Sequence, residues 1–306
     1  MKAILEAMES RLYGQSVNVR LLLAGLLAGG HVLLEGAPGL GKTKMARTLA
    51  ELTGGDYRRV QFTPDLMPGD ITGGVIFNMR ENDFKTVLGP VFTNVLLADE
   101  INRAGPKTQA ALLEAMEERQ VTIQGVTHPL PDPFFVIATQ NPVDYEGTYP
   151  LPEAQLDRFL FKLKLDYPAQ ADEDTMLKAH VPHTAQQEQT LAALLTPELV
   201  REERRRVAGI VVEDSLIHYI TTLIRKTRES NRIQLGASPR AGIAVLMASK
   251  AWAHLEGRSY VTPDDIKLVA RPALRHRLLL SPQAELEGAT SDHLIQETLA
   301  AVPVPR

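Results

Sequence analysis

A glycine-rich segment, Gly36–Thr43, constrains this chain more than any other feature of its sequence. Its residues, GAPGLGKT, fit the pattern G-x-x-x-x-G-K-[ST], in which backbone N–H groups surround the phosphates of a nucleotide. The pattern has this meaning only between a strand and a helix. The apolar run His31–Glu35 predicts a buried strand before it, and the helical spacing of apolar residues in Lys42–Leu52 predicts a helix after it. The sequence therefore predicts a phosphate site at the start of that helix.

Two side chains of this segment have predicted roles of their own. Lys42 would reach the β- and γ-phosphates as a point charge, and the Thr43 hydroxyl would bind Mg²⁺. The segment thus predicts binding of a nucleotide together with Mg²⁺. The residues expected to contact the nucleotide here are Gly36, Ala37, Pro38, Gly39, Leu40, Gly41, Lys42, Thr43 and Lys44.

The rest of the first half alternates strand-like and helix-like segments. Because its strands are apolar throughout, the alternation predicts a parallel sheet covered on both faces by helices. Two segments with polar tips, Val75–Leu88 and Gln120–Leu130, interrupt the alternation and are expected to be hairpin insertions. The predicted elements are strands at Tyr57–Phe62, Val95–Ala98, Phe134–Ala138 and Phe161–Leu165, and helices at Pro106–Arg119 and near Glu153–Phe159.

The pattern changes after Tyr167 and Pro168, where helical spacing replaces the alternation. We therefore expect an α/β core over residues 1–167 and a helical domain over residues 168–306. The predicted helices of the second part are Asp172–His180, Pro197–Ala208, Ser215–Glu229, Ser238–Glu256, Pro263–Arg275 and Ser291–Ala301.

Charge and composition exclude several classes of protein. Lys and Arg number 33 against 37 Asp and Glu, so a net charge of -4 gives no sign of a nucleic-acid binder. The chain has no cysteine, which excludes disulfides, thiolate zinc sites and a cysteine nucleophile. Met1–Arg11 contains no apolar signal core, and the longest apolar stretch, Leu21–Gly30, is about half of a membrane span. We expect a cytoplasmic protein that neither binds nucleic acid nor inserts into a membrane.

Polar residues follow two of the predicted strands, and ligands gather at the carboxyl ends of strands in a parallel sheet. Asp99 would order the water shell of the metal ion that Thr43 holds. Glu100 could take a proton from an attacking water, and Asn141 could hold that water in place. The alternatives are an ordinary acidic pair at a strand-to-turn junction and a turn-forming Asn before Pro142. The phosphate segment upstream favours the catalytic interpretation.

Five further stretches complete an ordered set of motifs over nearly the whole chain. They are Tyr13–Gln15, Leu97–Ala104, Ala138–Pro142, Pro150–Phe159 and Gly236–Ala241. Together with the glycine-rich segment, this set resembles an AAA+ ATPase of the MoxR family. The resemblance implies a P-loop AAA+ core, with a parallel sheet covered by helices, followed by a small all-α lid domain. It also implies an ATP hydrolase whose cofactors are ATP and Mg²⁺.

The resemblance implies roles for further residues. Arg158 matches the arginine finger, which reaches the γ-phosphate bound to the neighbouring subunit, and Arg240 matches the second sensor. Asn141 matches the first sensor, and Tyr13, Gly14 and Gln15 match the stretch that lines the adenine pocket. A cation at a helix C-terminus is the alternative for Arg158. The expected catalytic residues are Lys42, Glu100, Asn141 and Arg158, and the expected metal ligands are Thr43 and Asp99.

Family resemblance also implies a homo-oligomeric ring, expected to be a hexamer, that remodels client proteins with a partner bearing a von Willebrand factor A domain. A nucleic-acid motor is one alternative, but it would need basic hairpin tips, and the tip Arg80–Asp83 has mixed charge. A nucleotide switch without turnover is another, but it would lack Glu100. Phe77, Phe84 and Phe92 either present an apolar surface to a protein substrate or pack a hairpin onto the domain.

Overall fold

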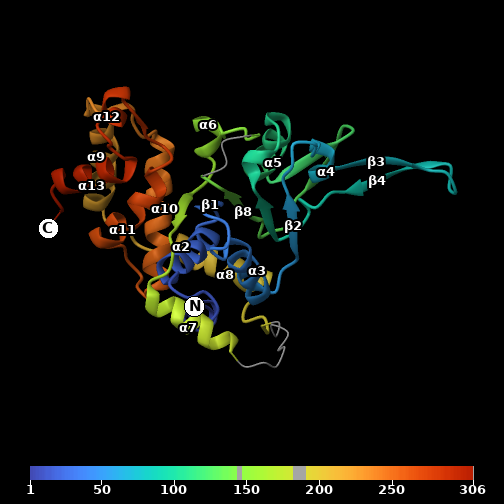
Figure 1. Ribbon diagram of the computed structural model, residues 1–306, viewed down its shortest axis with the longest axis horizontal. Helices are drawn as coiled ribbons and strands as arrows, with labels where there is room; N and C mark the ends of the chain where they lie inside the picture. The colour runs from blue at the N-terminus through green and yellow to red at the C-terminus, as the bar shows by residue number, and fades with distance from the viewer. Residues whose placement is uncertain (143–146, 182–190, 306) are drawn as a thin grey trace. The chain divides into compact units, whose positions relative to one another are not determined.

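The computed structural model describes residues 1–142, 147–181 and 191–305, and they form two compact units (Figure 1). Each unit combines segments that are far apart in the sequence. The first consists of Met1–Val19, Leu33–Leu151 and Lys164–Arg201, and the second of Arg20–Val32, Pro152–Leu163 and Glu202–Arg306. The division into domains of residues 1–167 and 168–306 stays a prediction.

A five-stranded sheet has the strand order β2-β5-β8-β1-β9. Strand β5 runs parallel to β2 and to β8, and Gln61 of β2 lies beside Asp99 of β5 in this register. All residues of β5 are buried, as expected for an apolar strand covered on both faces. The strands are β1 Val32–Gly36, β2 Tyr57–Gln61, β5 Val95–Asp99, β8 Phe135–Gln140 and β9 Phe161–Leu165. The predicted α/β class with a parallel sheet is confirmed.

Helices of the first unit begin and end where the sequence offers local signals. Helix α3 starts after Gly41 and ends before Gly54, and both glycines have positive φ (81° and 62°). It packs against β2 and β5. The helices that begin within this unit's segments are α1 Lys2–Glu9, α2 Ser16–Leu27, α3 Lys42–Thr53, α4 Pro68–Thr72, η1 Ile101–Arg103, α5 Pro106–Glu118, α7 Gln170–His180 and α8 Pro197–Ala208.

Both segments expected to form hairpins are antiparallel pairs in the structure. Strands β3 Gly73–Asn78 and β4 Asp83–Leu88 form one, and β6 Gln120–Ile123 and β7 Val126–Pro129 form the other. The β3–β4 hairpin extends well beyond α4 and α5 (Figure 1). At its base, a Cβ on Gly73 would lie 2.2 Å from the Val87 carbonyl oxygen, so only glycine fits there.

The three phenylalanines take different positions. Phe77 and Phe84 face each other edge to face across the hairpin, with ring centroids 5.2 Å apart, and remain 48% and 70% exposed. They therefore present an apolar surface instead of packing the hairpin down. Phe92 is half-buried, and its ring lies edge-on to that of His128, with ring centroids 6.2 Å apart.

The second unit is built mainly from helices. Helix α10 packs against α9 and α11, and α13 packs against α9 and α11. Strands β10 and β11 form a short antiparallel pair, which joins the α9–α10 connection to the α11–α12 connection. The elements are α6 Glu153–Leu156, α9 Asp214–Glu229, β10 Ile233–Leu235, α10 Pro239–Leu255, α11 Pro263–Leu274, β11 Leu279–Leu280, α12 Pro282–Leu286 and α13 Ser291–Ala301.

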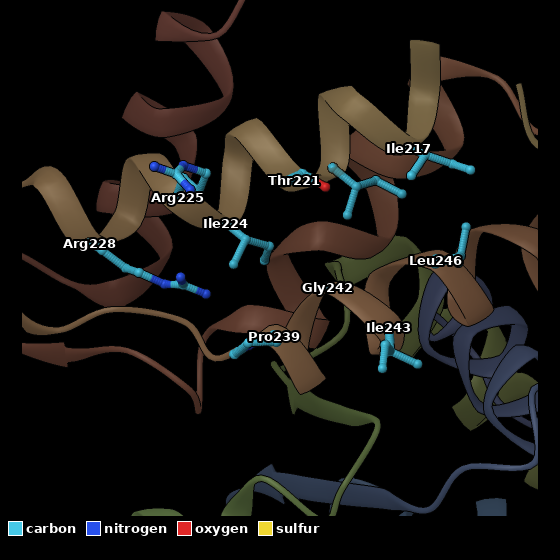
Figure 2. A pocket seen from close by; sticks show the side chains of 10 residues that line it. Ile217, Thr221, Ile224, Arg225, Arg228, Pro239, Gly242, Ile243 and Leu246 are labelled. Atoms are coloured by element: carbon cyan, nitrogen blue, oxygen red, sulfur yellow. The ribbon is translucent and has the colours of Figure 1, made fainter. Parts of the chain in front are cut away.

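An apolar groove of about 320 Å³ runs between α9 and α10 of this unit (Figure 2). Ile217, Ile243 and Leu246 are among the apolar residues that line it, and Arg225 and Arg228 line it nearer the end of α9. Among the residues that the structure describes, no helix is both long and apolar enough to span a bilayer.

Candidate functional site

The glycine-rich segment connects β1 to α3 in the first unit. Gly39 and Gly41 have φ of 86° and 81°, a region that L side chains rarely adopt, and a Cβ on Gly36 would lie 2.8 Å from the Leu165 carbonyl oxygen. The Lys42 ammonium donates to the carbonyl oxygens of Gly36 and Ala37, so it lies across the inside of the loop. The loop thus has the backbone conformation and the cation that a phosphate site needs.

Asp99, at the end of β5, is buried and fully engaged. Its Oδ1 accepts a hydrogen bond from the Thr139 hydroxyl at 2.6 Å, and its Oδ2 pairs with Arg59 Nη2 at 2.7 Å. The Thr139 hydroxyl also accepts from the backbone N–H of Glu100 at 2.8 Å. A single buried hydroxyl therefore fixes the side chain of one acidic residue and the backbone of the next.

Glu100 has left-handed backbone angles, φ 56° and ψ 51°. A non-glycine residue in this region is strained, and such strain concentrates at functional sites. Its carboxylate accepts from Gln61 Nε2 at 2.8 Å and pairs with Arg103 Nε at 3.1 Å. Because Gln61 belongs to β2, the carboxylate is held on the side of β5 away from β8 and β1.

Polar groups also end the strands on the other side of β5. Asn141 follows β8 directly and is 8% exposed. Gln140, at the end of β8, donates from Nε2 to the carboxylate of Glu35 near the end of β1. The ends of β1, β5 and β8 therefore carry polar side chains at the same edge of the sheet.

A cavity of about 400 Å³ lies beside the loop in the first unit. Gln15, one of its walls, is fixed because its amide donates to the Asp166 carbonyl oxygen at 3.1 Å and accepts from Asn18 at 2.7 Å. Gly14 has φ of 69°. The cavity brings the N-terminal stretch next to the loop, and is lined by Arg11, Leu12, Tyr13, Gln15, Pro38, Gly39, Leu40, Gly41, Lys44, Tyr167, Pro168, Glu173 and Met176.

Two of the expected site residues lie in the second unit. Arg158 follows the short helix α6 and is half-buried. Arg240 is exposed in the first turn of α10, whose N-cap Ser238 accepts from the backbone N–H of Ala241 at 3.3 Å.

Sequence reasoning missed several partners of the acidic pair: Arg59, Gln61, Arg103 and Thr139. A signal for two of them is present in β2, the edge strand of the sheet, where Arg59 and Gln61 are polar residues two apart and therefore lie on one face. Thr139 lies within the motif stretch Ala138–Pro142, but nothing in that pattern indicates which groups its hydroxyl binds.

The strand order, the loop and the acidic strand end define a P-loop ATPase of the AAA+ class. A family model described as "ATPase family associated with various cellular activities (AAA)" matches residues 31–161, and an "AAA lid domain" model matches residues 225–298. The chain belongs to the MoxR family of AAA+ ATPases. The predicted family is therefore confirmed.

Three known proteins illustrate the similarity. "Uncharacterized protein YeaC" of Bacillus subtilis is 50% identical over 93% of this chain and 88% of its own length. "Chaperone MoxR1" of Mycobacterium tuberculosis is 43% identical over 96% of this chain and 79% of its own length. A crystal structure of a putative ATPase from Cytophaga hutchinsonii superposes with a TM-score of 0.92 at 40% identity, covering 100% of this chain and 94% of the other.

Proposed function

We propose that this protein hydrolyses ATP with Mg²⁺ as a homo-oligomeric ring and uses the energy to remodel client proteins. The observation that supports hydrolysis most directly is the arrangement of Asp99, Glu100 and Thr139 at one strand end, in the same unit as the phosphate loop. A protein that only binds nucleotide has no need of a strained, side-chain-supported carboxylate there.

The phosphates bind the loop, where backbone N–H groups, the N-terminus of α3 and Lys42 all favour negative charge. The adenine occupies the adjoining cavity, whose size suits a nucleoside and whose walls include Tyr13 and Gln15. Lys44 also lines that cavity.

The residues present suit Mg²⁺, which takes oxygen ligands and keeps several waters beside substrate phosphates. Thr43 and Asp99 are the side chains that would hold it, and the ion would neutralise charge on the β- and γ-phosphates. The two hydrogen-bonded oxygens of Asp99 suit contact through water better than direct ligation.

Glu100 takes the proton from the attacking water, and Asn141 orients that water from the end of β8. Arg158 reaches the γ-phosphate bound to the next subunit and offsets the charge that develops there, so turnover depends on assembly. Arg240 reports the state of the nucleotide from the lid.

The wider biological role rests on relatives and resemblance. The name "Chaperone MoxR1" of the mycobacterial relative supports a chaperone-like role. We propose a hexamer in the cytoplasm, with a partner bearing a von Willebrand factor A domain and no nucleic-acid substrate. The exposed Phe77–Phe84 pair offers an apolar surface to a client. A pulldown with and without ATP that retrieves such a partner supports this role, and one that retrieves none counts against it.

Replacing Glu100 by Gln tests the chemistry. E100Q should keep the affinity for ATP and lower kcat by about 10²–10⁴-fold, since it removes only the general base. The measurements are equilibrium binding of a fluorescent ATP analogue and release of phosphate. Glu114→Gln, on the exposed face of α5, is the matched control and should leave both unchanged. An unchanged rate in E100Q would remove Glu100 from the mechanism.

Light scattering with and without ATP tests assembly. A ring that forms or tightens with ATP supports a finger supplied in trans, whereas strong hydrolysis by a strict monomer contradicts it. Strong stimulation of hydrolysis by single-stranded DNA would instead favour the nucleic-acid motor.

A further inference from the structure

The turn that carries Arg158 is held by a buried cation from a distant part of the second unit's sequence. Arg277 lies just beyond helix α11, and its side chain is 4% exposed. Its Nε donates to Asp157 Oδ1 at 2.5 Å, and its Nη2 donates to the carbonyl oxygens of Asp157 and Phe159 at 2.9 and 2.8 Å. Its Nη1 donates to the Leu160 carbonyl oxygen at 3.2 Å and to that of Ala273.

These contacts lie on both sides of Arg158. The carbonyl oxygens of Asp157 and Phe159 flank that residue, so fixing them limits the directions in which its side chain can leave the backbone. His276 adds a second bond to the Phe159 carbonyl oxygen, at 2.9 Å from Nε2. Phe159 itself is fully buried, which anchors the turn from the other side.

Arginine suits this position because its planar fork can serve several acceptors at once, whereas a lysine ammonium cannot reproduce the same geometry. Burial lowers the pKa of Arg277, and the Asp157 carboxylate opposes that effect. Removing a charge from water costs free energy, and here the Asp157 carboxylate and four carbonyl oxygens offset that cost, which limits the guanidinium to one geometry.

The segment that carries Arg277 also leads toward Arg240, the other expected site residue of the second unit. Two residues after Arg277, strand β11 pairs with β10, with Ile233 opposite Leu280. Strand β10 then runs through Gly236 into the start of α10, where Arg240 lies. Two short backbone segments, joined by this strand pair, therefore connect the support of Arg158 with the position of Arg240.

We propose that Arg277 is a positioning residue for Arg158: it fixes the turn 157–160 to the lid so that the Arg158 guanidinium points at the nucleotide of the neighbouring subunit. This inference rests on the proposed role of Arg158 in trans. Arg277 does not touch the nucleotide, and its loss affects turnover in the next subunit and leaves nucleotide binding in its own subunit intact.

The first experiment compares three variants as full-length assembled protein. Arg158→Ala sets the benchmark and should lower kcat by about 10³-fold or more. Arg277→Lys keeps the charge but loses the fork and should lower kcat by about 10²-fold, because a misplacement of about 1 Å costs that much. KM for ATP should change by less than about threefold in both, because neither residue binds the ground state. Arg258→Lys is the matched control and should keep its kcat, since Arg258 forms a two-point pair with Asp265 elsewhere in the same unit.

Mixing of variants tells a positioning role from a general loss of structure. In rings that mix R277K and E100Q subunits, some interfaces combine Glu100 of an R277K subunit with the supported Arg158 of an E100Q subunit. Activity should therefore recover at those interfaces. Rings that mix R158A and E100Q subunits should recover for the same reason. In rings of R277K and R158A subunits every finger is impaired, so no activity should return. Recovery in that second mixture would show that Arg277 acts on its own subunit's nucleotide and would overturn the proposal.

A second variant covers the possibility that R277K fails to assemble. Asp157→Asn removes the charge opposite Arg277 but leaves an oxygen for its Nε–H. It should lower kcat by about tenfold, the usual effect of losing part of a charged hydrogen bond, with the same mixing pattern. Wild-type kcat in D157N, or recovery with R158A, would contradict the proposal. If R158A itself keeps wild-type kcat, then the proposed finger fails, whatever the Arg277 variants show.

Discussion

The acidic strand end in the first unit and the arginine turn in the second hold their key side chains by opposite means. Glu100 is held through its own carboxylate, 31% exposed, by single contacts from Gln61 and Arg103. The turn of Arg158 is held through its backbone by Arg277, which is buried and makes five hydrogen bonds.

This difference indicates that the Glu100 side chain can change its position more easily than the turn of Arg158 can. Side-chain contacts near solvent exchange within nanoseconds and at little cost, so Glu100 can move between partners. A buried guanidinium cannot leave its acceptors without becoming a buried, unpaired charge, so the turn of Arg158 moves only as a rigid part of the second unit. The proposed roles of Glu100 as general base and of Arg158 as finger can both be tested by changing the residues that support them.

Among changes to the supports of Glu100 and of the Arg158 turn tested below, the largest effect on kcat is expected at Thr139. Like Arg277 in the second unit, Thr139 is buried and holds its target through the backbone. Thr139→Val keeps the shape but removes the hydroxyl that bonds Asp99 and the Glu100 backbone. It should lower kcat by about 10²-fold through misplacement, and lower the free energy of unfolding by about 1–3 kcal/mol. Phosphate release and denaturant titration measure the two effects. Thr139→Ser should restore most of both, and wild-type kcat in T139V would show that the backbone strain alone fixes Glu100.

This contrast also explains how much the sequence could reveal. The loop, the acidic pair and the helices of the lid follow from local patterns, and predicted helices such as Pro197–Ala208 and Ser291–Ala301 coincide with α8 and α13. Local patterns suffice there because helix spacing, caps and glycine conformations act within a few residues.

The supports could not be predicted in the same way. Arg277 acts on a turn 117 to 120 residues away in the chain, and Thr139 on residues about 40 away. In the sequence, nothing about either residue indicates which distant groups it binds. Strands β10 and β11 are too short for a period of two to be visible, so they went unpredicted as well.

Removing the side chain of Gln61 is expected to change kcat less than T139V does, and to raise it instead of lowering it. The amide of Gln61 holds the Glu100 carboxylate toward β2, away from β8 and from β1, the strand that leads to the phosphate loop. Gln61→Ala should therefore release the carboxylate and raise basal kcat by about three- to tenfold, a modest value because the contact is partly exposed. Steady-state phosphate release at saturating ATP measures it.

Gln120→Ala, at an exposed position of β6 in the same unit, serves as the control and should leave kcat unchanged. A fall in kcat for Q61A would reverse the comparison, because it would mean that Gln61 holds the general base in its working position and that both units rely on fixed supports.

The smallest effect concerns stability, at His276, which together with Arg277 forms the clamp on the turn 157–160. Burial, helped by the charge of Arg277 and then by Lys162 and Arg275, holds the pKa of His276 well below its usual 6.5, while the bond to Phe159 opposes this. The folded state therefore keeps His276 neutral while the unfolded chain takes up a proton below pH 6.5, so the contribution is complete above that pH and is lost as the pH falls. The loss should reach about 1.4 kcal/mol between pH 7.5 and pH 5.5.

His276→Gln isolates this contribution, since an amide can still donate to the Phe159 carbonyl oxygen but does not titrate. The free energy of unfolding of the wild type, minus that of H276Q, should fall by about that amount between the two pH values when measured by urea titration. A difference that stays constant with pH would mean that His276 takes up its proton in the folded lid. The turn of Arg158 would then be open to solvent, and the clamp would be as adjustable as the support of Glu100.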